Sequence, residues 1–236
     1  MDVSLSFAGE TLVPQPCGGL YWPTQETLLV ADLHFEKASA YAPKGRLLPP
    51  YDSHDTLAAL IDSIETTGAR RVICLGDSFH DAAGPARLAD GPRQTLQMLT
   101  RDLDWLWITG NHDDEAAGSL GGRVAPETRI GPLTLRHEAV PGDPAPELSG
   151  HFHPKITIRI RGRAITRRCF ALTATKIILP AYGALTGGLA VDDPAFTPVF
   201  AGPATALVTE AGRLLRFPVA APAIAQNHTH AAALRL

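Results

Sequence analysis

An apolar segment near the middle of the chain ends abruptly in polar side chains and reads Trp105-Leu106-Trp107-Ile108-Thr109-Gly110-Asn111-His112-Asp113. Two earlier apolar segments end in the same manner, one in Asp32 and His34 after residues 27–31, the other in Asp77 after residues 71–75. Such runs are typical of buried strands, and open α/β sheets gather functional side chains at the ends of their strands. The three segments therefore predict one shared polar site at one edge of a sheet.

Strand-like and helix-like segments alternate through the first half of the chain. Apolar residues recur at helical spacing from Ser53 to Thr66, with Ser53 or Asp52 as the expected N-cap. A second helix is predicted from about Pro92 to Arg101. Strands joined by helices imply right-handed parallel crossovers. The expected strands of this half are Val3–Phe7, Glu10–Val13, Leu20–Trp22, Thr27–Ala31, Arg71–Leu75 and Trp105–Thr109.

The second half is richer in β structure and contains an alternating basic segment. Along one expected strand, three isoleucines share a face, and the opposite face carries Lys155, Arg159, Arg161 and Arg163. The other expected strands are Arg123–Ala125, Thr128–Ile130, Leu133–His137, Ala164–Leu172, Thr197–Ala201, Thr205–Glu210 and Leu214–Phe217. We expect residues 1–217 to form a single domain and residues 218–236 a loose C-terminal tail.

The composition of the chain limits the classes of protein to which it can belong. The 236-residue chain is 45% hydrophobic, which is enough for one sizeable core, and its net charge of −3 gives no support for a strongly basic nucleic-acid binder. Three widely spaced cysteines in apolar contexts favour reduced core thiols over a disulfide framework. No signal-peptide pattern is visible, and no apolar run approaches the ~18 residues that span a bilayer. We therefore expect a cytoplasmic protein without membrane association.

Side chains that bind metals follow the predicted strands in an ordered series, which is Asp32, His34, Asp77, Asn111, His112, His137, His151 and His153. Carboxylate, imidazole and amide groups without cysteine suit divalent ions such as Mn²⁺, Fe²⁺ or Zn²⁺. A single Asp-x-His or Gly-Asp pair arises often by chance, and a lone buried histidine usually belongs to the core. The whole series, with each member after a strand, favours a metal site over these separate explanations.

The same series resembles the motifs of a known superfamily. Over about residues 26–155, the chain is similar to the calcineurin-like metallophosphoesterases. The matching motifs are Asp32-Leu33-His34, Gly76-Asp77, Gly110-Asn111-His112-Asp113, His137 and Gly150-His151-Phe152-His153, and no ligand position departs from the pattern of that superfamily. The resemblance implies an α/β fold, a four-layer α/β/β/α sandwich with two mixed β-sheets. It also implies one metal ion on Asp32, His34 and His153, a second on Asn111, His137 and His151, and Asp77 as the bridge.

Two divalent ions that lie about 3.5–4 Å apart and share a carboxylate lower the pKa of a water molecule that bridges them. We therefore expect a metal-bridging hydroxide to attack a phosphodiester. Mn²⁺ is the expected metal, with Fe²⁺ or Zn²⁺ as alternatives. We expect His112 to stabilise the transition state or protonate the leaving oxygen, and Asp113 to orient its ring. His80 and Asp81 follow Asp77 on the same loop, where a substrate contact and a structural hydrogen bond are equally expected.

A narrower resemblance reaches beyond the metal motifs. Over about residues 20–190, the chain is similar to the ligase-associated DNA damage response endonucleases called PdeM in His34-Phe35-Glu36-Lys37-Ala38, Leu48-Pro49-Pro50-Tyr51-Asp52, Leu75-Gly76-Asp77-Ser78-Phe79-His80-Asp81 and Thr186-Gly187-Gly188-Leu189. This resemblance implies an endonuclease of DNA repair, single-stranded DNA as its partner, and functional association with a DNA ligase and a helicase.

The candidates for substrate contact are basic residues near the predicted site, namely Lys37, Arg46, Lys155 and Arg159. Tyr41, on the loop that carries Lys37, is a candidate for stacking on a base. A charged strand face is, however, more often simply solvated. Two alternatives stay open: a phosphoesterase that acts on a small nucleotide or another phosphoester, and a non-catalytic scaffold with the same fold. The oligomeric state is not indicated.

Overall fold

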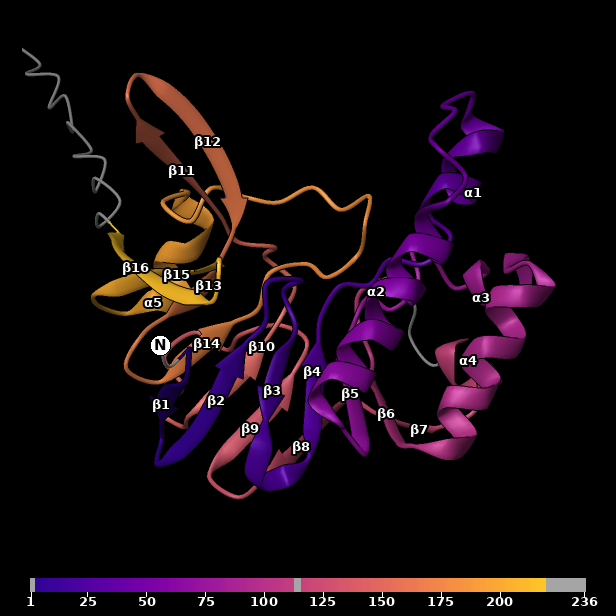
Figure 1. Ribbon diagram of the computed structural model, residues 1–236, viewed down its shortest axis with the longest axis horizontal. Helices are drawn as coiled ribbons and strands as arrows, with labels where there is room; N and C mark the ends of the chain where they lie inside the picture. The colour runs from indigo at the N-terminus through magenta and orange to yellow at the C-terminus, as the bar shows by residue number, and fades with distance from the viewer. Residues whose placement is uncertain (1–2, 113–115, 220–236) are drawn as a thin grey trace, which may run out of the picture.

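The computed structural model describes residues 3–112 and 116–219, which form two seven-stranded sheets and a separate hairpin (Figure 1). The first sheet contains, in the order of the chain, β1 (Leu5–Phe7), β2 (Glu10–Pro14), β3 (Leu20–Trp22), β4 (Thr27–Val30), β5 (Arg71–Leu75), β6 (Asp104–Ile108) and β7 (Arg123–Ala125). The helices are α1 (Lys37–Tyr41), α2 (Asp52–Thr67), α3 (Gly84–Arg87), α4 (Asp90–Asp102) and α5 (Thr197–Phe200).

The second sheet contains β8 (Glu127–Ile130), β9 (Leu133–Arg136), β10 (Glu147–Ser149), β13 (Phe170–Leu172), β14 (Lys176–Ile178), β15 (Ala204–Glu210) and β16 (Arg213–Val219). Its strand order is β16-β15-β13-β14-β10-β9-β8. Strand β10 pairs in parallel with both β9 and β14, whereas the other pairs are antiparallel. The strands β10 and β14 are not among the strands expected from the sequence.

The first sheet changes from antiparallel to parallel pairing along its length. Strands β1 to β4 form the predicted meander, and β4 to β7 pair in parallel, with α2 and α4 as crossovers on one face (Figure 1). Leu28 and Val30 pack toward these helices, whereas Leu29 and Ala31 pack toward the second sheet. Because both faces of the central strands are buried, their sequences are continuous apolar runs.

Three hydrophobic cores separate four layers. They lie between the helices and the first sheet, between the two sheets, and between the second sheet and the segment around α5. The structure is therefore an α/β/β/α sandwich, as the resemblance implied. The expected strand Thr197–Ala201 is wrong, because a 3₁₀ turn at Pro194–Phe196 continues directly into α5. Pro198 lies in the first turn of that helix, where backbone N–H groups have no partner within the helix, so the missing N–H of proline costs no hydrogen bond.

The basic segment forms a hairpin that projects from the sandwich, with strands β11 (Lys155–Ile160) and β12 (Arg163–Arg168) (Figure 1). The chain turns at Arg161 and Gly162, whose φ angles of 48° and 78° suit the tight turn of a hairpin. The prediction of one strand through Arg163 is therefore wrong. Arg163 pairs with Ile160 and so shares a face with the isoleucines rather than with Lys155. The expected strand Ala164–Leu172 is likewise divided, between β12 and β13.

The first turn of α2 is built differently from the capping prediction. The N-cap is Tyr51, which makes no side-chain cap, and Asp52 and Ser53 already belong to the helix. Their side chains instead bind the loop that follows β4. Asp52 Oδ2 accepts the Ala38 N–H at 2.9 Å, and Ser53 Oγ accepts the Glu36 N–H at 2.8 Å. The start of α2 thus positions α1 beside the residues that follow β4.

The remaining predictions concern the chain end, the cysteines and the membrane. Strand β16 runs to Val219, two residues past the expected end of the domain, and residues 220–236 of the expected tail lie outside the described part. Cys17, Cys74 and Cys169 form no disulfide with one another, and burial raises the pKa of the Cys169 thiol to about 12. Among the described helices, none combines the length and the apolar composition needed to cross a bilayer.

Candidate metal centre

The predicted metal ligands follow the carboxyl ends of parallel strands in both sheets. In the first sheet they follow β4, β5 and β6, and in the second sheet β9 and β10. Their side chains form two groups, each with its candidate ligand atoms within 4.8 Å of one another, and each group takes residues from both sheets. The first group is Asp32, His34 and His153, and the second is Asp77, His137 and His151.

Backbone conformation is unusual throughout these groups. Left-handed φ angles occur at Asp32 (54°), His34 (46°), Asp77 (47°), His151 (70°) and His153 (49°). Such conformations are costly for residues other than glycine and gather at functional sites, where the surrounding structure holds them. Here two backbone hydrogen bonds hold the loop after β4 against the loop after β5. The Asp32 N–H donates to the Gly76 carbonyl at 3.2 Å, and the His34 N–H donates to the Asp77 carbonyl at 2.9 Å.

Glycines precede the ligand residues because the loops approach each other too closely for a side chain. A Cβ atom on Gly76 would collide with the His137 ring, and one on Gly110 would collide with the Asp77 backbone nitrogen and carboxylate. A Cβ on Gly150 would lie 2.7 Å from Asp32 Oδ2. The glycines of the sequence motifs therefore have a packing reason that is independent of any resemblance.

In the first group, two imidazoles face a buried carboxylate. The Nε2 atoms of His34 and His153 lie 3.3 Å apart, and His153 Nε2 lies 3.3 Å from Asp32 Oδ1. Burial, followed by the neighbouring His153, lowers the pKa of His34 to about 2. His34 is therefore neutral near pH 7. A neutral imidazole nitrogen directed at a second imidazole and at a carboxylate is the donor arrangement of a divalent cation.

In the second group, a backbone contact selects the nitrogen that faces the site. His137 Nδ1 lies 2.9 Å from the Leu75 carbonyl, which can only accept, so Nδ1 carries the proton and Nε2 is free to bind a metal. His137 Nε2 lies 3.1 Å from His151 Nδ1 and 3.5 Å from Asp77 Oδ1. Burial, followed by the neighbouring His137, lowers the pKa of His151.

Asp77 lies between the two groups. Its Oδ1 atom faces His137, and its Oδ2 atom lies 3.8 Å from His34 Nε2 in the other group. The Asp77 side chain is only 4% exposed, so its charge is not screened by water. A buried carboxylate directed at two sets of nitrogen donors fits a site for two metal ions, and the absence of thiolate from both sets excludes a preference for soft metals.

His112 occupies the mouth of the site. Its backbone N–H donates to Asp77 Oδ1 at 3.0 Å, and its ring Nε2 lies 3.8 Å from Asp77 Oδ2. Ring Nδ1 lies 3.1 Å from the His80 carbonyl, so Nδ1 carries the proton and donates. Nε2 is therefore the ring atom on the side of the metal groups. Asn111 is an exposed turn residue beside His112, and the predicted orienting residue Asp113 lies outside the described residues.

The sequence left a substrate contact and a structural hydrogen bond equally open for His80, and the structure places it in a column of rings. The His80 ring stacks on the His112 ring, with 5.3 Å between centroids and 19° between planes, and it also lies 5.1 Å from the Tyr41 ring and 5.6 Å from the His34 ring. Asp81 does not join this column, because it pairs with Arg87 at 2.8 Å. The only sequence signal for His80 was its place three residues after Asp77. Glu138, 3.7 Å from His151 Nε2, was also missed, although it follows His137 directly.

The four predicted substrate residues lie at different distances from the site. The charge of Lys37 contributes to the lowered pKa values of His34 and His80, which places Lys37 beside both, and Lys155 in turn affects Lys37. Arg46 lies over the Tyr41 ring, 5.9 Å from its centroid, at the outer end of the column. Arg159 is exposed farther out on β11. The structure therefore brings Lys37 and Lys155 to the site and leaves Arg159 on the projecting hairpin.

Comparison with known proteins shows where this fold has been seen. The crystal structure of the nuclease MPE from Pseudomonas putida matches with a TM-score of 0.70 and 29% sequence identity, over 91% of this chain and 98% of that chain. A phosphoesterase from E. coli, YfcE, matches with a TM-score of 0.41 and 13% identity, over 82% of this chain and 99% of that chain. Searches of protein-family models and of curated proteins found no match.

The match to the Pseudomonas putida nuclease extends over nearly the whole of both chains, and the layer order is the one that the ordered Asp, His and Asn motifs implied. This chain is therefore a relative of that nuclease and has the fold of the calcineurin-like metallophosphoesterases.

Proposed function

We propose that the protein is a dinuclear metal-dependent phosphodiesterase that cleaves DNA as an endonuclease of the PdeM kind. The observation that carries the proposal is the buried carboxylate of Asp77 between two groups of metal-binding side chains. The likeness to a nuclease of Pseudomonas putida supports DNA as the substrate. Both sheets contribute to the two groups, which supports residues 1–217 as one functional unit.

Each residue of the site has a defined part in this chemistry. Asp32, His34 and His153 would hold one divalent ion, Asn111, His137 and His151 would hold the other, and Asp77 would be a ligand shared by both groups. Bound divalent ions supply Lewis-acid activation of the phosphate and lower the pKa of water toward neutrality. His112 donates its Nδ1 proton to the His80 carbonyl and presents Nε2 to the phosphate. In its imidazolium form the ring carries a second proton on Nε2, and this proton passes to the leaving oxygen.

Charge around the site supports a nucleic-acid strand. Residues 155–168 contain six lysine or arginine side chains and no carboxylate, in a chain whose net charge is −3. Such a hairpin neutralises backbone phosphates without reading sequence. The half-buried ring of Tyr41, which lies beside the His80 ring, supports single-stranded DNA, whose unpaired bases stack on aromatic side chains. The free thiols of the chain support a reducing compartment such as the cytoplasm.

The metal and the cellular setting belong to the same proposal. Mixed imidazole and carboxylate donors support Mn²⁺, which Fe²⁺ or Zn²⁺ can replace. The likeness of the Lys37 and His80 loops to the PdeM endonucleases supports a role in DNA repair beside a DNA ligase and a helicase.

The test compares the wild-type protein with Asp77→Ala and with Asp62→Ala, a matched exposed aspartate on α2. Each protein is incubated in MnCl₂ with labelled single-stranded DNA, with bis(p-nitrophenyl) phosphate and with p-nitrophenyl phosphate. We expect the wild type and Asp62→Ala to cleave DNA and the diester, and Asp77→Ala to be at background. A preference for the monoester would contradict the proposal in favour of a small-molecule phosphoesterase. If the wild type shows only background activity on every substrate and binds no ion, the result would support the alternative of a non-catalytic scaffold.

A further inference from the structure

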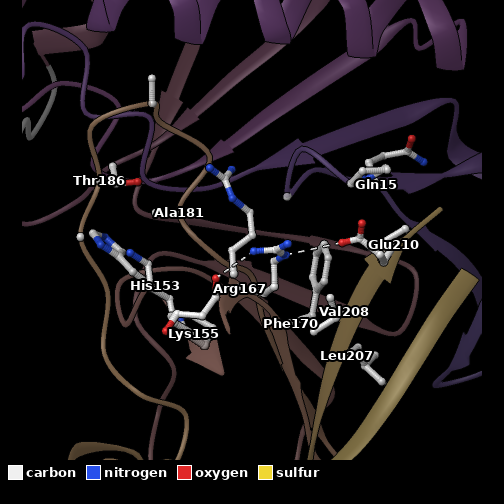
Figure 2. Close-up of a pocket in the computed structure, with 18 of the residues that line it drawn as sticks. Gln15, His153, Lys155, Arg167, Phe170, Ala181, Thr186, Leu207, Val208 and Glu210 are labelled. Atoms are coloured by element: carbon white, nitrogen blue, oxygen red, sulfur yellow. Dashed lines mark hydrogen bonds and ion pairs between the residues drawn. The ribbon is translucent and has the colours of Figure 1, made fainter. Parts of the chain in front are cut away.

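A pocket of about 610 Å³ opens beside the metal centre, and His153 lines both (Figure 2). The pocket lies between the base of the β11–β12 hairpin, strand β15 and the loop that follows β14. Phe170, Leu207 and Val208 border the pocket, and their side chains are buried in the cores on the two faces of the second sheet. The volume falls within the range typical of sites for small organic ligands, so the pocket is large enough for one nucleotide.

The wall of the pocket nearest the metal centre carries more positive charge than its surroundings neutralise. Lys155 and Arg168 are directly opposite each other in the hairpin, a pairing of like charges that costs stability. Arg168 Nη1 donates to the carbonyls of Cys17 and Tyr182, which orients its guanidinium but leaves its charge in place. Within the described part of the chain, neither Lys155 nor Arg168 forms an ion pair.

Arg167 is the cation that another residue restrains. Figure 2 shows Arg167 between Lys155 and Glu210, and its Nε atom lies 3.6 Å from Glu210 Oε2. Both side chains are about half exposed, at 49% and 57%, so the ion pair is weak and Arg167 is free to move to a stronger partner. A phosphate is such a partner, because its oxygens accept two guanidinium hydrogen bonds at once.

We infer that this pocket is a nucleotide subsite of the phosphodiesterase, an inference that rests on the proposed function. The nucleotide next to the scissile phosphate lies in the pocket, and its own phosphate binds Arg167. Glu210 competes for Arg167 and repels the phosphate, so it limits affinity at this subsite. The subsite distinguishes a nucleic-acid strand from a small diester that has no flanking phosphate.

The experiment measures kcat and KM in MnCl₂ for a short single-stranded DNA oligonucleotide and for bis(p-nitrophenyl) phosphate. The variants are Arg167→Gln, Glu210→Gln and the control Arg129→Gln, an exposed arginine on β8 at the far edge of the second sheet. Loss of one charge-assisted phosphate contact should raise KM for the oligonucleotide about tenfold in Arg167→Gln. Glu210→Gln should lower that KM, and Arg129→Gln should leave it unchanged. For bis(p-nitrophenyl) phosphate, all three variants should match the wild type.

The outcomes separate this inference from the proposed function. If the wild type hydrolyses neither substrate, the proposed function fails. If both substrates are hydrolysed but Arg167→Gln changes neither KM, the pocket is not a subsite. A loss on both substrates to the same degree would also overturn the inference, because it would indicate a structural role for Arg167. An increase in oligonucleotide KM for Glu210→Gln would show that the Arg167–Glu210 pair supports binding rather than limits it.

Discussion

In the proposed mechanism, the contacting residues His112 and Asp77 have different roles. The Asp77 carboxylate is buried between two groups of imidazoles, which suits a ligand, whereas the His112 side chain is 46% exposed and belongs to neither group. Contact with the His80 carbonyl determines the protonated nitrogen of His112. A histidine held in this way and open to solvent is suited to proton transfer rather than to metal binding.

Replacement of His112 tests this division. We expect His112→Ala to keep both metal ions while its kcat for bis(p-nitrophenyl) phosphate falls about 10²–10⁴-fold, the usual contribution of a positioned general acid. Metal content is measured by elemental analysis and kcat by release of p-nitrophenol. His54→Ala, an exposed histidine on α2, is the control and should retain both properties. Loss of metal from His112→Ala would instead make His112 a ligand, and full activity would remove it from the mechanism.

At the level of elements, the first turn of α2 holds the loop that carries Lys37. Asp52 is buried, and its carboxylate accepts the buried Ala38 N–H rather than capping its own helix. Asp52 also raises the pKa of Lys37 against the larger effect of burial, which lowers it. One side chain therefore keeps Lys37 both in place and charged.

The loop contact should be measurable as stability. Asp52→Ala leaves the Ala38 N–H buried without a partner, and we expect the free energy of unfolding to fall by about 1–3 kcal/mol. Asp52→Asn keeps an acceptor oxygen, so its free energy of unfolding should fall by less than that of Asp52→Ala. The control Asp62→Ala, on the exposed face of the same helix, should change it by no more than about 0.5 kcal/mol. Urea denaturation measures all three, and equal losses in Asp52→Ala and Asp62→Ala would contradict the proposed tie between α2 and the loop.

At the level of the whole molecule, the candidate metal centre joins the two sheets. Each group of ligands combines a carboxylate from the first sheet with histidine from the second, so an ion bound to either group links both halves of the sandwich. Without a bound ion, the imidazoles and buried carboxylates of the two ligand groups contribute little to the stability of the contact between the sheets. Metal binding should therefore stabilise the folded state as a whole.

Thermal unfolding with and without metal tests this link. Ion binding at about one hundred times Kd contributes ~2.7 kcal/mol, which corresponds to a rise in Tm of about 5–10 °C for a domain of this size. We expect MnCl₂ to produce such a rise in the wild type and in Asp62→Ala, and EDTA to reverse it. Asp77→Ala should show no rise. A Tm of the wild type that does not respond to Mn²⁺, Fe²⁺ or Zn²⁺ would contradict a metal centre between the sheets.

Local sequence was sufficient to predict most strands of the first sheet, its parallel crossovers and the ordered series of ligand residues. The physical reason is that each signal is short in range: a buried parallel strand is a continuous apolar run, and each ligand follows its strand within a few residues. The same locality explains the errors. The helix at Thr197–Phe200 packs against the second sheet, and Asp52 binds the Ala38 N–H rather than capping its own helix, so both depend on residues outside the segment. The turn at Arg161 and Gly162 is local, but the regular alternation of isoleucine and basic residues on either side of it hid it.

Only the tertiary structure showed which ligands share a group, that His80 stacks on His112, and that Arg167 meets Glu210 across a pocket beside His153. These contacts join residues from different sheets and loops, and their geometry follows from how the two sheets pack rather than from any one segment. The apolar run from Trp105 to Ile108 predicts that His112 stands at the end of a strand. The loops that follow β4 and β5, which bring His34, Asp77 and His80 beside it, determine what His112 faces there.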